Sequence, residues 1–273
     1  MLTDSDIERW LREDVGHHDV TNDVPGTTEG RLVAKEAGVV AGLDAATAVF
    51  EYLDCAVETP IESGTAIDAG DVVLRVDGPA QSVLRGERVA VNVTGHASGV
   101  ATKTRAAVDA AESTTTDSTP RIAGTRKTTP GLRGIEKRAV AAGGGDTHRL
   151  DLSHMVMVKD NHVAEMGLVE AIEHFRERAS FATKLDVEVE APEDAPRAAE
   201  AGADIVLLDN MTPGETERAV DLVADANAKA LTEASGGITV ESVPAYADTG
   251  VDIISMGSLT HSVPTLDFSF RTG

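Results

Sequence analysis

The second half of this chain alternates short apolar runs with segments of helical spacing, and this alternation restricts the possible folds more than any other feature. The runs are rich in β-branched residues and lie at 155–158, 185–189, 204–208, 230–231 and 251–255. Segments of helical spacing lie between them, at 168–179, 192–201 and 216–227. Apolar strands joined by helices predict a parallel sheet that is covered on both faces. A long succession of such units favours a (β/α) barrel over an open sheet, although the spacing does not establish closure.

The preceding part of the chain lacks this alternation and indicates a separate α+β region. Apolar spacing predicts a helix over 4–13, with Thr3 or Asp4 as its N-cap. Strands are expected at 31–37, 56–58 and 72–76, and a long helix over 86–101. The small, polar segment 111–120 is expected to form a surface loop.

Polar residues follow each predicted strand of the second half. They are Lys159 and Asp160, Glu188 and Glu190, Asp209 and Asn210, Glu233 and Ser235, and Gly257. The carboxyl ends of parallel strands meet at one edge, where barrel enzymes carry their active sites. Strand ends are also polar simply because loops begin there, so a single residue indicates little. Lys159, Glu188 and Asp209 lie within or directly after apolar runs, and this favours a site.

The segment 121–159 is basic in a chain that is otherwise strongly acidic. It holds eight Lys and Arg against three Asp and Glu, a local balance of +5 in a chain of net charge −22. A concentrated positive region suits a small, multiply anionic substrate. The residues that suit planar carboxylates or phosphates are Thr125, Arg126, Lys127, His148 and Arg149. Glu136, with Lys137 and Arg138, is expected to lie on a solvated helix face.

Two turns that contain glycine follow the last two predicted strands. Their sequences are Ser-Gly-Gly-Ile-Thr over 235–239 and Ser-Met-Gly-Ser-Leu-Thr over 255–260. Glycine lets backbone N–H groups approach a phosphate closely, and a following helix adds partial positive charge. Because late barrel loops are a frequent phosphate site, we expect a phosphate cradle here. The triple glycine 143–145 is not a P-loop, because no Gly-Lys-Ser/Thr follows it.

The composition excludes several classes of protein. An acidic surface repels nucleic acid and anionic membranes, so we expect neither as a partner. The acids are spread along the chain, which favours a halophilic protein whose stability rises with salt. Cys55 is the single cysteine, so no intramolecular disulfide and no cysteine-based zinc site can form. The N-terminus does not have the composition of a signal peptide, and no apolar run reaches the ~20 residues of a membrane span, so we expect a cytoplasmic protein.

Several motifs, in order and spacing, resemble the quinolinate phosphoribosyltransferase family over nearly the whole chain. The most specific is RIAGTRKTTPGLRGIEKRAVAAGGGDTHRLDLSHMVMVKDNH over 121–162. Further segments are EDVG at 13–16, DVT at 19–21, GPA at 78–80, GER at 86–88 and SGVAT at 98–102. The resemblance continues through VEV at 187–189, LDN at 208–210, EASGG at 233–237 and TGVD at 249–252.

This resemblance implies an α/β fold with two domains. An N-terminal open α/β sandwich is expected over 1–103, joined by the tail 263–273, and a C-terminal (β/α) partial barrel over 104–262. It also implies a homodimer or hexamer whose active sites are shared between subunits. The implied reaction converts quinolinate and 5-phosphoribosyl 1-pyrophosphate into nicotinate mononucleotide, pyrophosphate and CO₂ in de novo NAD biosynthesis.

The resemblance also implies roles for individual residues. Quinolinate is expected to contact Arg126, His148, Arg149 and Lys159, with Arg88 reaching in from the partner subunit. Lys127, Glu188 and Asp209 are expected to flank the phosphoribosyl pyrophosphate and its Mg²⁺, which Glu188 and Asp209 hold directly or through water. Ser235, Gly236, Gly237, Ser255, Met256 and Gly257 are expected to hold the 5′-phosphate, and Thr125 to line the site. Lys127, Lys159, Glu188 and Asp209 are the expected catalytic residues.

Other interpretations fit the same residues. Glu188 and Asp209 are also suited to be internal ion-pair partners of Lys159. The rival functions are a related phosphoribosyltransferase of the ModD type that accepts another base, a barrel that senses a phosphorylated metabolite, and an aldolase-type barrel that uses Lys159 as a Schiff base. The number of carboxylate-binding cations argues against the first and the third, and the Glu188 and Asp209 pair argues against the second.

Overall fold

The computed structural model describes residues 2–114 and 119–273. The chain divides into two compact units. Unit 1 comprises Met1–Arg105, Thr129–Gly144 and Ser262–Gly273, and unit 2 comprises Ala106–Thr128 and Gly145–His261. The domain boundaries expected at 103/104 and 262/263 stay a prediction.

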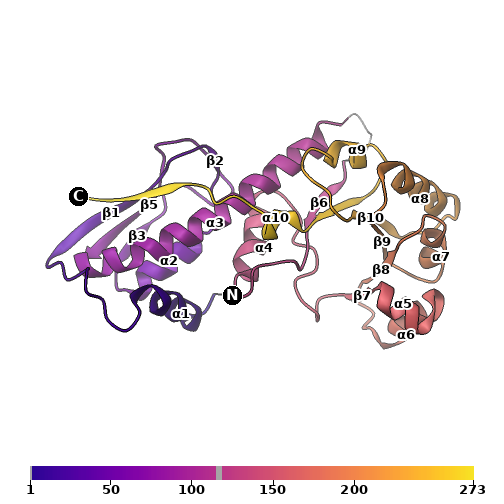
Figure 1. The fold of residues 1–273 in the computed structure, drawn as a ribbon, viewed down its shortest axis with the longest axis horizontal. Coiled ribbons are helices and arrows are strands. Elements are labelled where there is room, and N and C mark those ends of the chain that lie inside the picture. The colour runs from indigo at the N-terminus through magenta and orange to yellow at the C-terminus, as the bar shows by residue number, and fades with distance from the viewer. Residues whose placement is uncertain (1, 115–118) are drawn as a thin grey trace. The chain divides into compact units, whose positions relative to one another are not determined.

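Unit 1 is built around an antiparallel sheet of four strands in the order β12-β1-β5-β3. The strands are β1 (Thr27–Ala34), β3 (Ala56–Glu58), β5 (Val72–Pro79) and β12 (Phe268–Thr272), with a small separate pair, β2 (Gly38–Val39) and β4 (Ala66–Ile67). The last strand runs beside the first, with Leu32 opposite Phe270 (Figure 1). Leu32, Leu74 and Phe50 are fully buried, and Phe50 stacks on Phe270 with ring centroids 5.8 Å apart. These apolar side chains form the core of the unit.

Helix capping and close packing explain two features of the helices of unit 1. They are α1 (Asp4–Val15), α2 (Leu43–Tyr52), α4 (Arg133–Ala142) and most of α3 (Ala80–Glu112). Thr3 caps α1, as expected, through a capping box with Asp6. Helix α3 is longer than the expected 86–101. A Cβ on Gly99 would lie 2.0 Å from the Pro264 carbonyl oxygen, so this glycine allows the helix to approach the C-terminal tail.

The segment 111–120 begins as the end of α3, and its residues 115–118 lie outside the described residues. The prediction of a solvated helix face at Glu136 was wrong, because Glu136 is 0% exposed and Lys137 is 3% exposed. The prediction failed because the Glu136 carboxylate has hydrogen-bond partners in the fold, and these partners allow it to be buried. Its carboxylate accepts hydrogen bonds from Thr129 N–H at 3.0 Å and lies 2.9 Å from His96 Nε2.

Unit 2 contains a parallel sheet of six strands in the order β6-β11-β10-β9-β8-β7, which confirms the α/β class. The strands are β6 (Arg121–Gly124), β7 (Val156–Val158), β8 (Leu185–Val189), β9 (Ile205–Asp209), β10 (Leu231–Ser235) and β11 (Ile253–Met256). The predicted apolar runs fall on five of them. Sequence analysis missed β6, because its four residues lie at the start of the basic segment.

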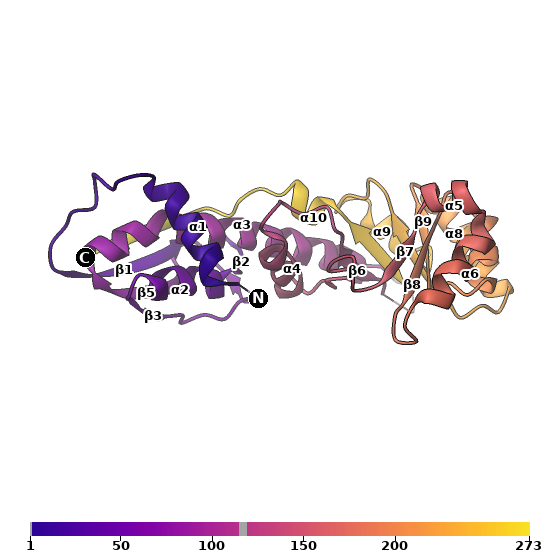
Figure 2. The same ribbon diagram turned by 90° about the horizontal axis from the view of Figure 1, so that it is seen from below.

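Short helices connect these strands. They are α5 (Asp160–Met166), α6 (Leu168–Arg178), α7 (Asp194–Glu200), α8 (Pro213–Asp225), α9 (Val243–Ala247) and α10 (Ser258–His261). Helices α6, α7 and α8 lie along the same side of β8 and β9 (Figures 1 and 2). They bury Val187, Val206 and Leu208 completely. Since the strands are parallel, their carboxyl ends lie at one edge of the sheet. No helix among the described residues is long and apolar enough to cross a membrane.

Candidate active site

A cavity of about 450 Å³ lies at the carboxyl ends of the unit 2 strands. It gathers every predicted site residue except Arg88. These are Thr125, Arg126, Lys127, His148, Arg149, Lys159, Glu188, Asp209, Ser235, Gly236, Gly237, Ser255, Met256 and Gly257. Arg88 belongs to α3 of unit 1, where its side chain is exposed. The roles that these residues play in a reaction stay predictions.

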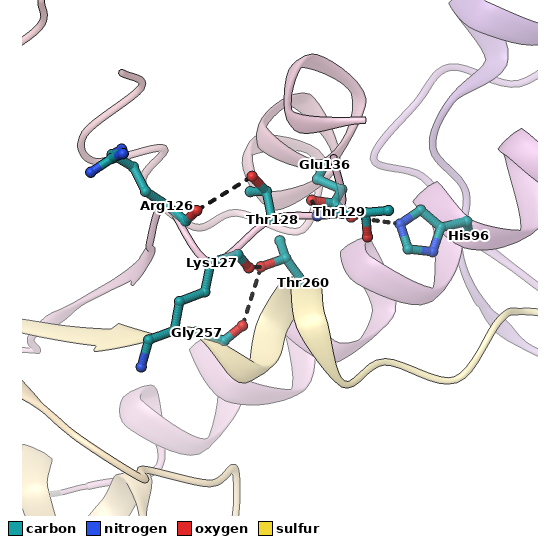
Figure 3. A network of polar contacts seen from close by, with 8 residues as sticks. All are labelled: His96, Arg126, Lys127, Thr128, Thr129, Glu136, Gly257 and Thr260. Carbon is teal, nitrogen blue, oxygen red and sulfur yellow. Dashed lines mark hydrogen bonds and ion pairs between the residues drawn. The ribbon is translucent and has the colours of Figure 1, made fainter. Parts of the chain in front are cut away.

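The loop after β6 places two cations at the cavity. Thr125 accepts a hydrogen bond from the backbone N–H of Lys127 at 3.1 Å. The Thr260 hydroxyl donates to the carbonyl oxygen of Lys127 at 2.7 Å, so α10 fixes the loop, and the side chains of Arg126 and Lys127 extend from it (Figure 3). A Cβ on Gly257 would lie 2.9 Å from Cδ of Lys127. The lysine side chain therefore lies directly over Gly257, and a larger residue there would displace it.

Two carboxylates face the cavity from β8 and β9. Lys159 Nζ donates to Glu188 Oε2 at 2.8 Å, so the ion pair that the sequence left open is present. Asp209 accepts a hydrogen bond from Asn210 Nδ2 at 2.6 Å. Burial raises the pKa of Asp209, and the negative charge of Glu188 raises it further. Two carboxylates that repel each other in the same cavity are suited to hold a cation between them.

The turn after β10 presents backbone and hydroxyl donors. Gly236 and Gly237 have φ angles of 102° and 62°, which glycine adopts without strain. A Cβ on Gly236 would lie 2.3 Å from Oδ1 of Asn210, so no other residue fits there. At the end of β11, the buried Ser255 hydroxyl has no hydrogen-bond partner among the described residues. This geometry is suited to a phosphate, which accepts hydrogen bonds from N–H and O–H groups.

The floor of the cavity holds a buried group that sequence analysis did not assemble. His148 Nε2 lies 2.8 Å from Glu233 Oε2, with the two side chains 9% and 1% exposed. Asp186, the second residue of β8, is 0% exposed. Neither of its oxygens has a hydrogen-bond partner within the described part of the chain. A signal was available, because Asp186 is two residues before Glu188 on one strand and so faces the same side.

The buried group of His148, Asp186 and Glu233 lies near the charge of Arg149, and Arg149 is 7% exposed. Burial and the negative charge of Glu233 raise the pKa of Asp186 well above its usual value. Burial lowers the pKa of Arg149, and Arg126 nearby lowers it further, whereas Asp186 opposes both effects. Among the described residues, His148, Asp186 and Glu233 form one group whose potential metal-ligand atoms lie within 4.8 Å of one another.

The site therefore combines three chemical capacities in one cavity. Arg126, Arg149 and Lys159 are suited to carboxylates. The glycine turns are suited to a phosphate, and Glu188 with Asp209 to a hard divalent cation. No nucleophile activated by a base is apparent among the lining residues, so the arrangement is suited to orienting two anionic reactants.

Comparison with known proteins gives consistent matches. The family profiles described as "Quinolinate phosphoribosyl transferase", N-terminal and C-terminal domains, match residues 19–98 and 100–271. The probable nicotinate-nucleotide pyrophosphorylase (carboxylating) of Methanothermobacter thermautotrophicus is 42% identical over 272 residues, covering 97% of both chains. The human nicotinate-nucleotide pyrophosphorylase (carboxylating) is 42% identical over 268 residues, covering 97% of this chain and 90% of its own.

Solved structures agree with these sequence matches. The crystal structure of NadC from Streptococcus pyogenes is similar at a TM-score of 0.90 and 40% identity, covering 99% of this chain and 97% of its own. The nicotinate-nucleotide pyrophosphorylase from Francisella tularensis has a TM-score of 0.91 at 28% identity, covering 100% and 98%.

Proposed function

This chain belongs to the quinolinate phosphoribosyltransferase family, and we infer that it is a nicotinate-nucleotide pyrophosphorylase (carboxylating) that makes nicotinate mononucleotide for NAD biosynthesis. Its substrates are quinolinate and 5-phosphoribosyl 1-pyrophosphate. The observation that carries this conclusion is one cavity of unit 2, where carboxylate-binding cations and glycine-rich phosphate turns line the same space. A phosphoribosyltransferase for a neutral base has no need of the cations.

In the first step, the quinolinate nitrogen attacks C1′ of the ribose and pyrophosphate leaves. Positive charge grows on the ribose while negative charge grows on the leaving group. Lys127 supports the departing pyrophosphate with its ammonium group. The backbone N–H groups of Gly236 and Gly237, with the Ser255 hydroxyl, hold the 5′-phosphate.

A magnesium ion fits this site, because Glu188 and Asp209 supply two carboxylates that line the cavity and repel each other. These residues would hold it directly or through water, and when bound it would neutralise the pyrophosphate. Lys159 already pairs with Glu188, so its ammonium holds the carboxylate in place. The role of Asp209 requires its ionised form.

In the second step, the 2-carboxylate leaves as CO₂, and the electron pair of the broken C–C bond is drawn toward the pyridinium nitrogen. A proton then replaces the carboxylate on C2. The substrate supplies the electron sink, so the residues of the site act by orientation. The carboxylates of quinolinate are bound by Arg126, Arg149 and His148. Lys159 delivers the proton.

We further propose that the active enzyme is at least a dimer in which Arg88 of one subunit completes the site of the other. The support is that Arg88 is exposed on α3 and does not line the cavity of unit 2. An exposed arginine in the family's GER motif is suited to bind a dicarboxylate across an interface.

A comparison of bases tests the proposed function. Purified protein is supplied with phosphoribosyl pyrophosphate and Mg²⁺, together with quinolinate, nicotinate or a neutral nitrogenous base, and mononucleotide and pyrophosphate are measured. Efficient turnover of quinolinate alone is expected. Preference for a neutral base would overturn the assignment in favour of the ModD-type alternative, and binding of phosphoribosyl pyrophosphate without turnover of any base would favour a sensor.

A further inference from the structure

The buried carboxylate of Glu233, on the cavity floor, has no part in the chemistry described above. Resting on the proposed function, we propose that Glu233 is a positioning residue that holds the ring of His148 with both nitrogens protonated, so that Nδ1–H donates a hydrogen bond to a carboxylate of quinolinate. It touches neither the ribose nor the pyrophosphate in this account. Its removal should therefore weaken the binding of one substrate and spare the other.

The contact between the two side chains determines the orientation of the ring. Glu233 Oε2 lies 2.8 Å from His148 Nε2, and the glutamate is 1% exposed. An ionised carboxylate only accepts hydrogen bonds, so Nε2 must carry the hydrogen. Nδ1 is then the ring nitrogen left for the substrate, and it donates to a carboxylate only when the ring carries both protons, because in the neutral ring it is an acceptor. A fixed second partner is the usual way in which proteins select the state of a functional histidine.

The backbone of His148 points to the same role. Its φ is 51°, a left-handed conformation that side-chain-bearing residues seldom adopt, and the Asp146 carboxylate accepts its N–H at 2.7 Å. Such conformations persist where the surrounding structure holds them, and they concentrate at functional sites. The backbone thus presents the ring to the cavity while Glu233 fixes its rotation.

The same atoms could in principle hold a metal ion, since His148, Asp186 and Glu233 lie within ligand distance of one another. The neighbouring charges favour the positioning role. Arg149 is buried and interacts electrostatically with Asp186, so a guanidinium already lies beside this group. A divalent ion would add two further positive charges next to this arginine.

A double-mutant cycle tests the proposal. Glu233→Ala, His148→Ala and the double variant are compared with the wild type in steady-state assays with each substrate varied. Glu233→Ala should raise the KM for quinolinate about 10- to 100-fold, the range for losing a hydrogen bond to a charged group. The KM for phosphoribosyl pyrophosphate should change less than about threefold. The double variant should be no more than about threefold worse than His148→Ala, because Glu233 acts through that ring.

Two further variants control for misfolding. Glu233→Gln keeps an oxygen that accepts from Nε2–H, so its KM for quinolinate should lie closer to that of the wild type than to that of Glu233→Ala. Glu136→Gln alters a matched buried pair, Glu136 with His96, away from this cavity. It should lower the melting temperature without a selective change in the KM for quinolinate. Melting curves of all variants separate stability from binding.

The outcomes are distinct. Three results would overturn the positioning role. They are additive effects of the two substitutions in the cycle, an unchanged KM for quinolinate in Glu233→Ala, and a KM for quinolinate in Glu233→Gln that is as high as in Glu233→Ala. Stoichiometric zinc or manganese in dialysed wild type, lost in Glu233→Ala, would overturn it in favour of a metal site. If the wild type does not turn over quinolinate, the proposed function itself fails, which is a separate result from any of these.

Discussion

At the scale of single residues, the site keeps groups that cost stability. Asp186 is a buried carboxyl without a hydrogen-bond partner among the described residues, and His148 has a left-handed backbone. Isolated buried acids destabilise a fold unless they are paired or neutral. Their presence around one cavity indicates selection for function over stability.

Replacing Asp186 with Asn should stabilise the protein, and more so at higher pH. The raised pKa means that folded Asp186 keeps its proton while the unfolded chain loses it above about pH 4. The wild type therefore loses stability as pH rises through this window, up to the raised pKa, and the Asn variant does not. Chemical denaturation should show a gain of roughly 1–3 kcal/mol at pH 7. A difference that shrinks with rising pH would contradict this.

Gly236→Ala should weaken the binding of phosphoribosyl pyrophosphate. The new Cβ would clash with Asn210, and the φ of 102° is strained for alanine, at a cost of roughly 1–3 kcal/mol. The KM for phosphoribosyl pyrophosphate should rise about tenfold or more, because relief of the clash displaces the backbone N–H groups that hold the 5′-phosphate. Gly214→Ala, where a Cβ meets nothing within 4 Å, is the matched control and should leave this KM unchanged. Equal effects of the two substitutions on this KM would rule out a phosphate cradle at Gly236.

At the scale of elements, the periodic parts of the fold could be predicted from the sequence, and the irregular parts could not. Apolar runs such as 205–208 are strands because two covered faces require continuous apolar residues. The strand β6 has only four residues within a basic segment, so no local pattern distinguishes it. Fourteen site residues could be named from the motifs. The contact between His148 and Glu233 joins residues 85 positions apart, which only tertiary structure reveals.

The junction between α6 and the strands β8 and β9 should weaken in acid. Burial alone raises the pKa of Asp204, but hydrogen bonds from Arg176, the Leu185 N–H and Lys184 outweigh it and hold the pKa below its usual value. The stabilising contribution is therefore present at neutral pH and is lost as pH falls through the lowered pKa, below about pH 4.

Asp204→Asn tests this contribution. It should lower the free energy of unfolding by about 1–2 kcal/mol at pH 7, and the difference from the wild type should shrink toward pH 3. The exposed Asp225, substituted in the same way, serves as the control and should have little effect. A difference that stays constant with pH would show that the ion pairs are not its source.

At the scale of the whole molecule, we propose that two subunits share their active sites. The net charge of −22 makes association sensitive to salt, so assembly is best measured in high-salt buffer. Matches to both family profiles, over residues 19–98 and 100–271, show that the chain carries both halves of the family's fold.

Mixing two inactive variants tests the shared site. Arg88→Ala and Lys159→Ala homodimers should each be nearly inactive, because each lacks a cation of every site. After subunit exchange, half of the dimers are hybrids with one intact site, so about a quarter of the wild-type activity should return if Arg88 acts across the interface. Light scattering confirms the oligomeric state. No recovery from mixed, exchanged dimers would place Arg88 and Lys159 in the same subunit's site.

The measurement that tests the central claim most directly is the fate of the quinolinate 2-carboxylate. Protein in high-salt buffer is mixed with Mg²⁺, phosphoribosyl pyrophosphate and quinolinate labelled at that carboxylate, and labelled CO₂ is followed together with nicotinate mononucleotide. The account predicts equal amounts of both, with none of either when phosphoribosyl pyrophosphate is omitted. Folded protein that binds phosphoribosyl pyrophosphate but releases no labelled CO₂ would contradict it.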